Sequence, residues 1–170
     1  MKATETKLKG VYVLEPQVFG DARGWFMESW SKRKLEAAGI SVDFVQDNQS
    51  YSAQKGTLRG LHYQLDPMAQ AKLLRATRGA IFDVAVDIRK GSPTFGKHVA
   101  AYLFAADSAF ARSREAEAGG LAPFLQFFIP CGFAHGFIVL EDDTLFAYKC
   151  DNAYCPAAER ELRFDDPALH

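Results

Sequence analysis

The fold is decided by two stretches of sequence: GTLRGLHYQLDPMAQAKLLRATRG at residues 56–79 and PCGFAHGF at residues 130–137. Both consist of short apolar and aromatic runs bounded by glycine or proline, which is typical of β-strands separated by turns. The same pattern continues outward along most of the chain, and helix signals are few. The sequence therefore predicts an all-β fold, either a sandwich or a barrel.

The clearest strand is expected at residues 81–89, where Phe82, Val84 and Val86 alternate with Asp83 and Asp87, giving one apolar face and one acidic face. Further strands are expected at residues 11–14, 49–52, 58–64, 72–77, 98–104, 125–129, 136–140 and 145–150. One surface helix is expected at residues 32–38, between Ser31 as N-cap and Gly39 as stop. The polar, alanine-rich residues 107–120 are expected to form a solvated loop or a short helix.

Length and composition fit one globular domain over residues 1–170, since the chain is 48% hydrophobic and 24% charged. A net charge of −1 gives no reason to expect nucleic acid or an anionic membrane as partner. Three cysteines without CxxC spacing favour free thiols in the cytoplasm over disulfides or a zinc site. The N-terminus has no apolar core and no long apolar stretch follows, so neither secretion nor membrane insertion is expected.

The two deciding stretches also resemble the metal site of the cupin family, in which three histidines and a glutamate sit at fixed places between glycines. His62 and His135 keep their places in this frame. Gln64 stands where another histidine would be, and Lys72 replaces the glutamate. A charged ammonium has no lone pair and repels a divalent cation, so no metal and no cofactor are expected.

A positive charge at the place of a metal suggests a pocket that still stabilises developing negative charge. His62 is a candidate general base, Lys72 can hold an enolate oxygen, and Tyr148 can return a proton from the opposite face. Asp83 can orient His135, or it can be solvated. Taken singly, these residues have ordinary roles as a hydrogen-bonded histidine, a surface lysine and a core tyrosine, and their combination favours a site.

The position of Arg59 beside His62 leaves two alternatives. In a regular strand these side chains point to opposite faces and do not meet. Either Gly60 marks a β-bulge, or Arg59 lies at the start of the strand and reaches around it.

Several motifs, in order along the chain, resemble the dTDP-4-dehydrorhamnose 3,5-epimerase family. They lie at residues 19–24, 44–48, 58–62, 82–89, 92–96 and 129–137, within a likeness that runs from about residue 11 to residue 167. The resemblance implies a cupin jelly roll (a double-stranded β-helix) with one or two short peripheral helices. It also implies a homodimer, free of metal and cofactor, that inverts C3 and C5 of dTDP-4-keto-6-deoxyglucose in L-rhamnose biosynthesis for cell-surface polysaccharide.

The resemblance implies His62 as proton acceptor and Tyr148 as proton donor, with Lys72, Arg59 and His135 around the sugar and phosphates. The substrate-binding residues that it implies are Arg23, Glu28, Gln46, Asp47, Asn48, Arg59, Lys72, His135, Glu159 and Tyr154, which would stack on the base. In this family an N-terminal strand crosses to the partner, so Arg23 and Glu28 are expected to complete the neighbour's site.

Two departures from the family bear on these expectations. Residues 107–120 make one strand connection longer, as a lid or a surface bulge. The family usually continues beyond the region that matches residues 165–167, with an aspartate that pairs with the catalytic histidine. Without that aspartate, either another group orients His62 or activity is reduced. Asp83 is a candidate for this role if geometry allows. Rival functions are C3-only epimerisation, another nucleotide 4-keto sugar, a catalytically silent sugar-nucleotide-binding module and, least favoured, a metal-dependent cupin.

Overall fold

The computed structural model describes residues 1–113 and 119–169. Its strands are β1 (Lys2–Glu5), β2 (Tyr12–Glu15), β3 (Val18–Asp21), β4 (Gly24–Met27), β5 (Gln46–Ser52), β6 (Leu58–Gln64), β7 (Lys72–Arg78), β8 (Ala80–Asp87), β9 (His98–Phe104), β10 (Gln126–Ile129), β11 (Phe133–Val139), β12 (Thr144–Cys150) and β13 (Glu159–Glu161). One α-helix, α1 (Lys32–Ala37), and two 3₁₀ turns, at Phe110–Arg112 and Pro167–Leu169, accompany them.

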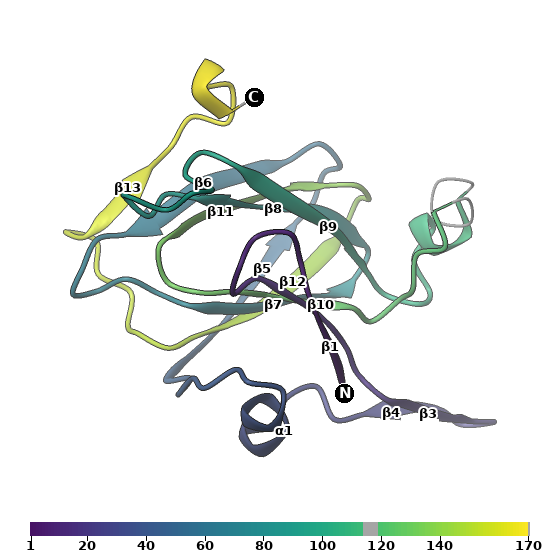
Figure 1. Ribbon diagram of the computed structural model, residues 1–170. Helices are drawn as coiled ribbons and strands as arrows, with labels where there is room; N and C mark the ends of the chain where they lie inside the picture. The colour runs from purple at the N-terminus through teal and green to yellow at the C-terminus, as the bar shows by residue number, and fades with distance from the viewer. Residues whose placement is uncertain (114–118, 170) are drawn as a thin grey trace.

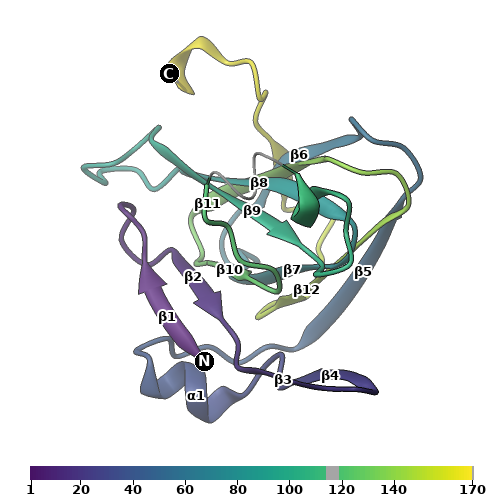
Figure 2. The same ribbon diagram turned by 90° about the vertical axis from the view of Figure 1, so that its right-hand side faces the viewer.

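Two antiparallel sheets face each other and form a jelly-roll barrel (Figure 1). One sheet has the order β1-β2-β10-β7-β12-β5, and the other has the order β13-β6-β11-β8-β9. The hairpin β3–β4 extends away from the barrel on the side where α1 also lies, in both this view and the view turned by 90° (Figure 2). The expected all-β architecture with few helices is confirmed.

The main core lies between the two sheets. Leu74, Phe127 and Phe146 come from the six-stranded sheet and pack against Ile81 and Leu103 of the other sheet. These side chains are almost wholly withdrawn from water, which stabilises the barrel by roughly 1.5–3 kcal/mol for each large residue. A second cluster joins α1 to the outer face of the six-stranded sheet. Polar residues line one end of the barrel interior.

The acidic face of β8 turns inward, so that of the two alternatives for Asp83 the structure shows the contact with His135 and not solvation. Asp83 and Asp87 are both 0% exposed, as is Ala85 between them. The apolar row that includes Phe82 and Val84 instead lines a groove of about 410 Å³ on the outer surface. An alternating pattern shows that a strand has two faces, but it does not say which face is inside when the barrel interior holds a polar site.

Most expected strands are confirmed, those at residues 58–64 and 98–104 with the same bounds. The expected helix is α1, with Ser31 at its N-cap. Sequence patterns missed β1, the β3–β4 hairpin and β13, which have three or four residues each and are too short for a periodic signal. Within residues 107–120, residues 110–112 form a 3₁₀ turn, and 114–118 lie outside the described residues. No helix in residues 1–113 and 119–169 is long and apolar enough to cross a membrane.

Candidate active site

A cavity of about 520 Å³ opens between the two sheets, and we call it the barrel cavity. His62 on β6 and His135 on β11 line it from the five-stranded sheet. Lys72 on β7 and Tyr148 on β12 line it from the six-stranded sheet. The remaining lining residues are Ser50, Leu58, Arg59, Gly60, Phe137, Phe146, Tyr154, Glu159 and Glu161. The fold thus brings all three catalytic candidates into one cavity.

A bulge at Gly60 places Arg59 and His62 in the same cavity, which decides between the two alternatives. His62 is paired with His135 across β6 and β11, but Arg59 is paired with Phe137, so the register shifts between them. Gly60 has φ +102°, and a Cβ there would lie 2.5 Å from the backbone oxygen of His135. Only glycine fits this backbone without strain.

The imidazole of His62 contacts Glu161, with 2.8 Å between Nε2 and Oε1. Asp83 was a candidate for this place only if geometry allowed, and the geometry does not allow it, because the Asp83 carboxylate is engaged by His135. Gln64, at the second cupin histidine position, has a structural role: its amide donates to the carbonyl of Ala153 at 3.2 Å and accepts from the N–H of Cys155 at 2.8 Å.

His135 and Asp83 form a buried pair, with 2.9 Å between Nε2 and Oδ1. This is the contact that the sequence suggested for orienting His135. Burial raises the pKa of the Asp83 carboxyl, and the neighbouring His135 and Lys72 counteract that rise. The imidazole also stacks on Phe146, with 6.2 Å between ring centroids. His135 is therefore held firmly in one orientation.

Lys72 is directed into the barrel rather than into bulk water. Its burial lowers the pKa of the ammonium below the ordinary value of 10.5, while Cys150, Asp83 and Glu159 act in the opposite direction. Cys150 is its cross-strand neighbour on β12, and burial raises the pKa of that thiol to about 11. A cation in such a poorly solvated position interacts strongly with any anion that forms beside it.

Tyr148 carries a phenol suited to donating a proton. Burial raises the pKa of its hydroxyl above the ordinary value of 10.0, so the group stays protonated at neutral pH. The ring packs against Phe146 with 5.5 Å between centroids, at the edge of the main core.

A smaller cavity of about 290 Å³ adjoins the barrel cavity and shares Tyr148 and Tyr154 with it. Gln46 and Asn48 line this smaller cavity together with Gln70. The Tyr154 hydroxyl donates to Glu159 at 2.7 Å, and its backbone N–H donates to Gln46 at 2.9 Å. The two cavities together form an elongated polar site with an exposed aromatic ring beside it.

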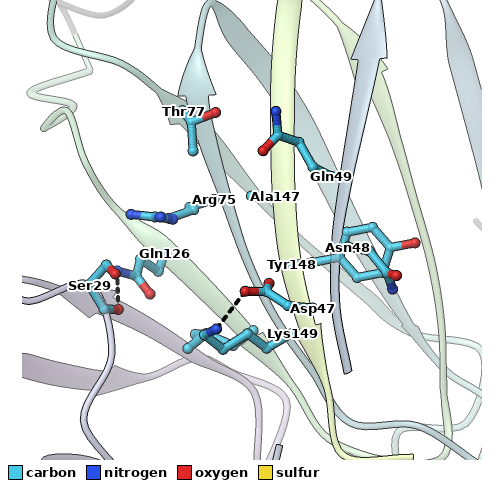
Figure 3. A pocket seen from close by; sticks show the side chains of 11 residues that line it. Ser29, Asp47, Asn48, Gln49, Arg75, Thr77, Gln126, Ala147, Tyr148 and Lys149 are labelled. Carbon is cyan, nitrogen blue, oxygen red and sulfur yellow. Dashed lines mark hydrogen bonds and ion pairs between the residues drawn. The ribbon is translucent and has the colours of Figure 1, made fainter. Parts of the chain in front are cut away.

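Asp47 lines neither the barrel cavity nor the smaller cavity, which differs from its place in the expected binding set. Its carboxylate pairs with Lys149 at 2.8 Å, in a third cavity of about 440 Å³ whose lining includes Arg75 and Gln126 and shares Asn48 and Tyr148 with the smaller cavity (Figure 3). Successive side chains of β5 point to opposite faces, so Asp47 lies outside the barrel while its two neighbours point inward.

Arg23 and Glu28 lie outside the lining of the barrel cavity in their own chain. Arg23 pairs with Asp21 in the β3–β4 hairpin, and Glu28 pairs with Lys34 on α1 at 2.9 Å. The hairpin also exposes large aromatic side chains, with Trp25 58% and Phe26 69% accessible. These placements are compatible with a role in a neighbouring subunit.

Sequence reasoning missed two polar residues of the barrel cavity, Ser50 and Glu161. Ser50 follows Asn48 by two positions on β5, so strand parity alone was enough to place it on the inner face. Glu161 bears the same relation to Glu159, but β13 is too short to be recognised from sequence. In residues 1–113 and 119–169, no cluster of three or more His, Cys, Asp or Glu side chains is arranged to hold a metal ion.

The model of the dTDP-4-dehydrorhamnose 3,5-epimerase family matches residues 5–111 and 121–170. A dTDP-4-dehydrorhamnose 3,5-epimerase of Shigella flexneri is 47% identical over 171 residues, covering 100% of this chain and 85% of the relative.

Solved structures show the same likeness. The epimerase of Bacillus anthracis, crystallised with TDP and PPi, superposes with a TM-score of 0.87 at 42% identity, covering 99% of this chain and 87% of the other. An epimerase of Legionella pneumophila in complex with dTDP-4-keto-L-rhamnose superposes with a TM-score of 0.83 at 45% identity, covering 99% of this chain and 80% of the other. The chain therefore belongs to the dTDP-4-dehydrorhamnose 3,5-epimerase family.

Proposed function

We propose that the protein inverts C3 and C5 of a dTDP-4-keto-6-deoxyhexose, the reaction of the family to which it belongs. The observation that carries this proposal is the placement of His62 and Tyr148 on different sheets around one cavity. Inversion requires a base on one face of the sugar and an acid on the other. A barrel cavity with a candidate of each kind on opposite walls meets this requirement.

The reaction follows from the acidity of carbons next to a ketone. His62 takes the proton from C3 or C5, and the electron pair of the broken C–H bond moves to the C4 oxygen as an enolate. Lys72 stabilises this oxyanion because its charge is already in place and poorly solvated. Tyr148 then protonates the carbon from the opposite face and completes the inversion. The ketone activates both neighbouring carbons, so one set of groups serves twice.

Binding of the nucleotide is assigned to the smaller cavity and the rim of the barrel. Tyr154 offers an exposed ring for stacking on the base, with Gln46 and Asn48 beside it. Arg59 lines the barrel cavity and suits a diphosphate, because a planar guanidinium binds two oxygens at once. Lys72, His135 and Glu159 remain for the sugar.

The functional unit is proposed to be a homodimer of single-domain subunits in the cytoplasm. Two features support this: Arg23 and Glu28 lie outside the barrel cavity of their own chain, and the β3–β4 hairpin exposes aromatic side chains. Carried to a neighbouring subunit, the hairpin would bring Arg23 to its nucleotide. The three free cysteines agree with a reducing compartment.

Product configuration tests the proposed function. The protein is incubated with dTDP-4-keto-6-deoxyglucose, and the ring proton couplings of the product are read by NMR. The expected product is inverted at both C3 and C5. Inversion at C3 alone supports the C3-only alternative, and tight dTDP binding with unchanged sugar supports a silent binding module.

A further inference from the structure

Backbone pairing brings Glu161 next to His62. The Cα atoms of the two residues are paired across β13 and β6. The adjacent pair, Leu61 and Leu162, exchanges two backbone hydrogen bonds, at 2.8 and 3.3 Å. In an antiparallel ladder the next pair is then non-hydrogen-bonded, and its Cα atoms approach to about 4.5 Å, where side chains come closest. The register of β13 against β6 therefore places these two side chains in contact.

The contact fixes which nitrogen of His62 is basic. Glu161 Oε1 lies 2.8 Å from Nε2, and an ionised carboxylate only accepts hydrogen bonds, so Nε2 carries the hydrogen. A neutral imidazole has a single free lone pair, which is then on Nδ1. The other carboxylates nearby have partners of their own: buried Asp83 pairs with His135, and Glu159, which also lines the cavity, accepts from Tyr154 at 2.7 Å.

We propose that Glu161 is the positioning residue for His62: it fixes the tautomer and orientation of the imidazole so that Nδ1 removes the sugar proton, and it stabilises the imidazolium that results. The inference rests on the proposed function, because an oriented base matters only if a C–H bond is broken. In the step, the proton passes from carbon to Nδ1 and the electron pair becomes the enolate. Glu161 keeps its charge throughout and takes no proton.

The exposure of the pair separates this role from a structural one. The side chains of His62 and Glu161 are 38% and 76% accessible, and ion pairs so open to water contribute little to stability. Removing the carboxylate should leave the fold nearly unchanged and act on the chemical step. The same accessibility lets a small carboxylate from solution occupy the vacated place.

The test compares wild type with Glu161→Ala and Glu161→Gln, and uses Glu36→Gln on α1 as a control for the same chemical change outside the cavity. In D2O with dTDP-4-keto-6-deoxyglucose, kcat for exchange is expected to fall about 10- to 100-fold in both Glu161 variants, with KM and Tm close to wild type. Sodium formate is expected to restore part of the rate in Glu161→Ala. Wild-type exchange rates in both Glu161 variants overturn the proposal.

A second measurement detects the contact between His62 and Glu161 in protein that is not turning over substrate. The nitrogens of His62 are observed by NMR in protein labelled with ¹⁵N-histidine and assigned by comparison with His62→Ala. Wild type is expected to show the Nε2–H tautomer, and Glu161→Ala a mixture of tautomers; identical tautomers in the two overturn the role of Glu161. An inactive wild type contradicts the proposed function instead, and the tautomer comparison still decides this inference.

Discussion

His62 and His135 occupy paired positions on neighbouring strands, yet each ring contacts a different carboxylate. The side chain of His135 is 9% accessible and pairs with a fully buried aspartate, whereas that of His62 is 38% accessible. A base must reach both the substrate and, between turnovers, water to release its proton. The relationship therefore supports the proposal that His62 transfers the proton and that His135 has a fixed binding role.

Replacing His62 should strongly reduce exchange at both carbons. His62→Ala is expected to lower deuterium exchange at C3 and C5 together by about 10²- to 10⁴-fold, because one imidazole serves both positions. Binding of dTDP, measured by calorimetry, should be retained. Loss of label at one carbon only would show that a second base acts at the other.

Removing the acid should separate exchange from inversion. Tyr148→Phe keeps the ring that packs on Phe146 but lacks the hydroxyl. His62 can still remove and return a proton on its own face, so label is expected to enter C3 and C5 while inversion falls about 10²-fold or more. If Tyr148→Phe inverts the sugar at the normal rate, the assigned acid is wrong.

Lys72→Met should stabilise the fold while it impairs the reaction. Burial lowers the pKa of Lys72, which means that the charged ammonium destabilises the folded state. This loss of folding stability is fully present below the pKa that Lys72 has in the folded protein, and it disappears as the pH rises toward 10.5. At pH 7 the variant is expected to gain about 1 kcal/mol, or about 2–4 °C in Tm, and to lose about 10²- to 10³-fold in exchange. The gain in stability should fade at alkaline pH, and a less stable variant at pH 7 would contradict this account.

Asp87 stabilises the fold outside the barrel cavity. Its buried carboxylate accepts from Arg89, Ser92 and Thr94, and these bonds lower its pKa despite burial. A lowered pKa gives stability that is present above about pH 4 and lost as pH falls further. Asp87→Asn is expected to cost about 3 kcal/mol at pH 7 in urea unfolding, and clearly less at pH 3.

A surface pair provides the control for that measurement. Asp165 and Arg163 make a similar two-residue carboxylate–guanidinium contact, but both side chains are exposed. Asp165→Asn should therefore change stability by less than about 1 kcal/mol at either pH. A pH-independent loss in Asp87→Asn would show that its charge is not the source of the stability.

The dimer hypothesis predicts complementation between inactive variants. If Arg23 serves the neighbour's site, a mixed dimer of Arg23→Glu and His62→Ala subunits contains one complete site. After subunit exchange, equal amounts should recover about a quarter of wild-type activity, since half the dimers are mixed and one of their two sites is intact. A mixture of His62→Ala and Tyr148→Phe should recover none, because both changes lie in the same barrel. If the first mixture also stays inactive, Arg23 does not act across the dimer.

The local sequence pattern predicted the strands that carry the site, but it did not predict which face of each strand lies inside the barrel. The strand at residues 58–64 was predicted with its bounds because turn residues, Gly56 and Asp66-Pro67, lie on either side of it, and a bulge at Gly60 was one of two alternatives. The sequence placed Asp83 on an acidic face but did not show that this face lies inside the barrel. Alternation of apolar and polar residues does not distinguish a polar interior from solvent.

Long-range pairing explains the other differences. Asp47 was grouped with its neighbours by motif, although strand parity sends its side chain out of the barrel. Glu161 lies 99 residues from His62, on a strand of three residues, so no local signal could bring them together. Such contacts depend on sheet register, which a single sequence does not specify.

The central claim is that one base and one acid, on opposite walls of the barrel cavity, act on both carbons beside a ketone. Position-resolved exchange tests it most directly: the protein and dTDP-4-keto-6-deoxyglucose are incubated in D2O, and deuterium at each carbon is followed by NMR. The account predicts label at both C3 and C5, in a product inverted at both. Absence of label from both carbons, with the nucleotide sugar bound, would contradict it.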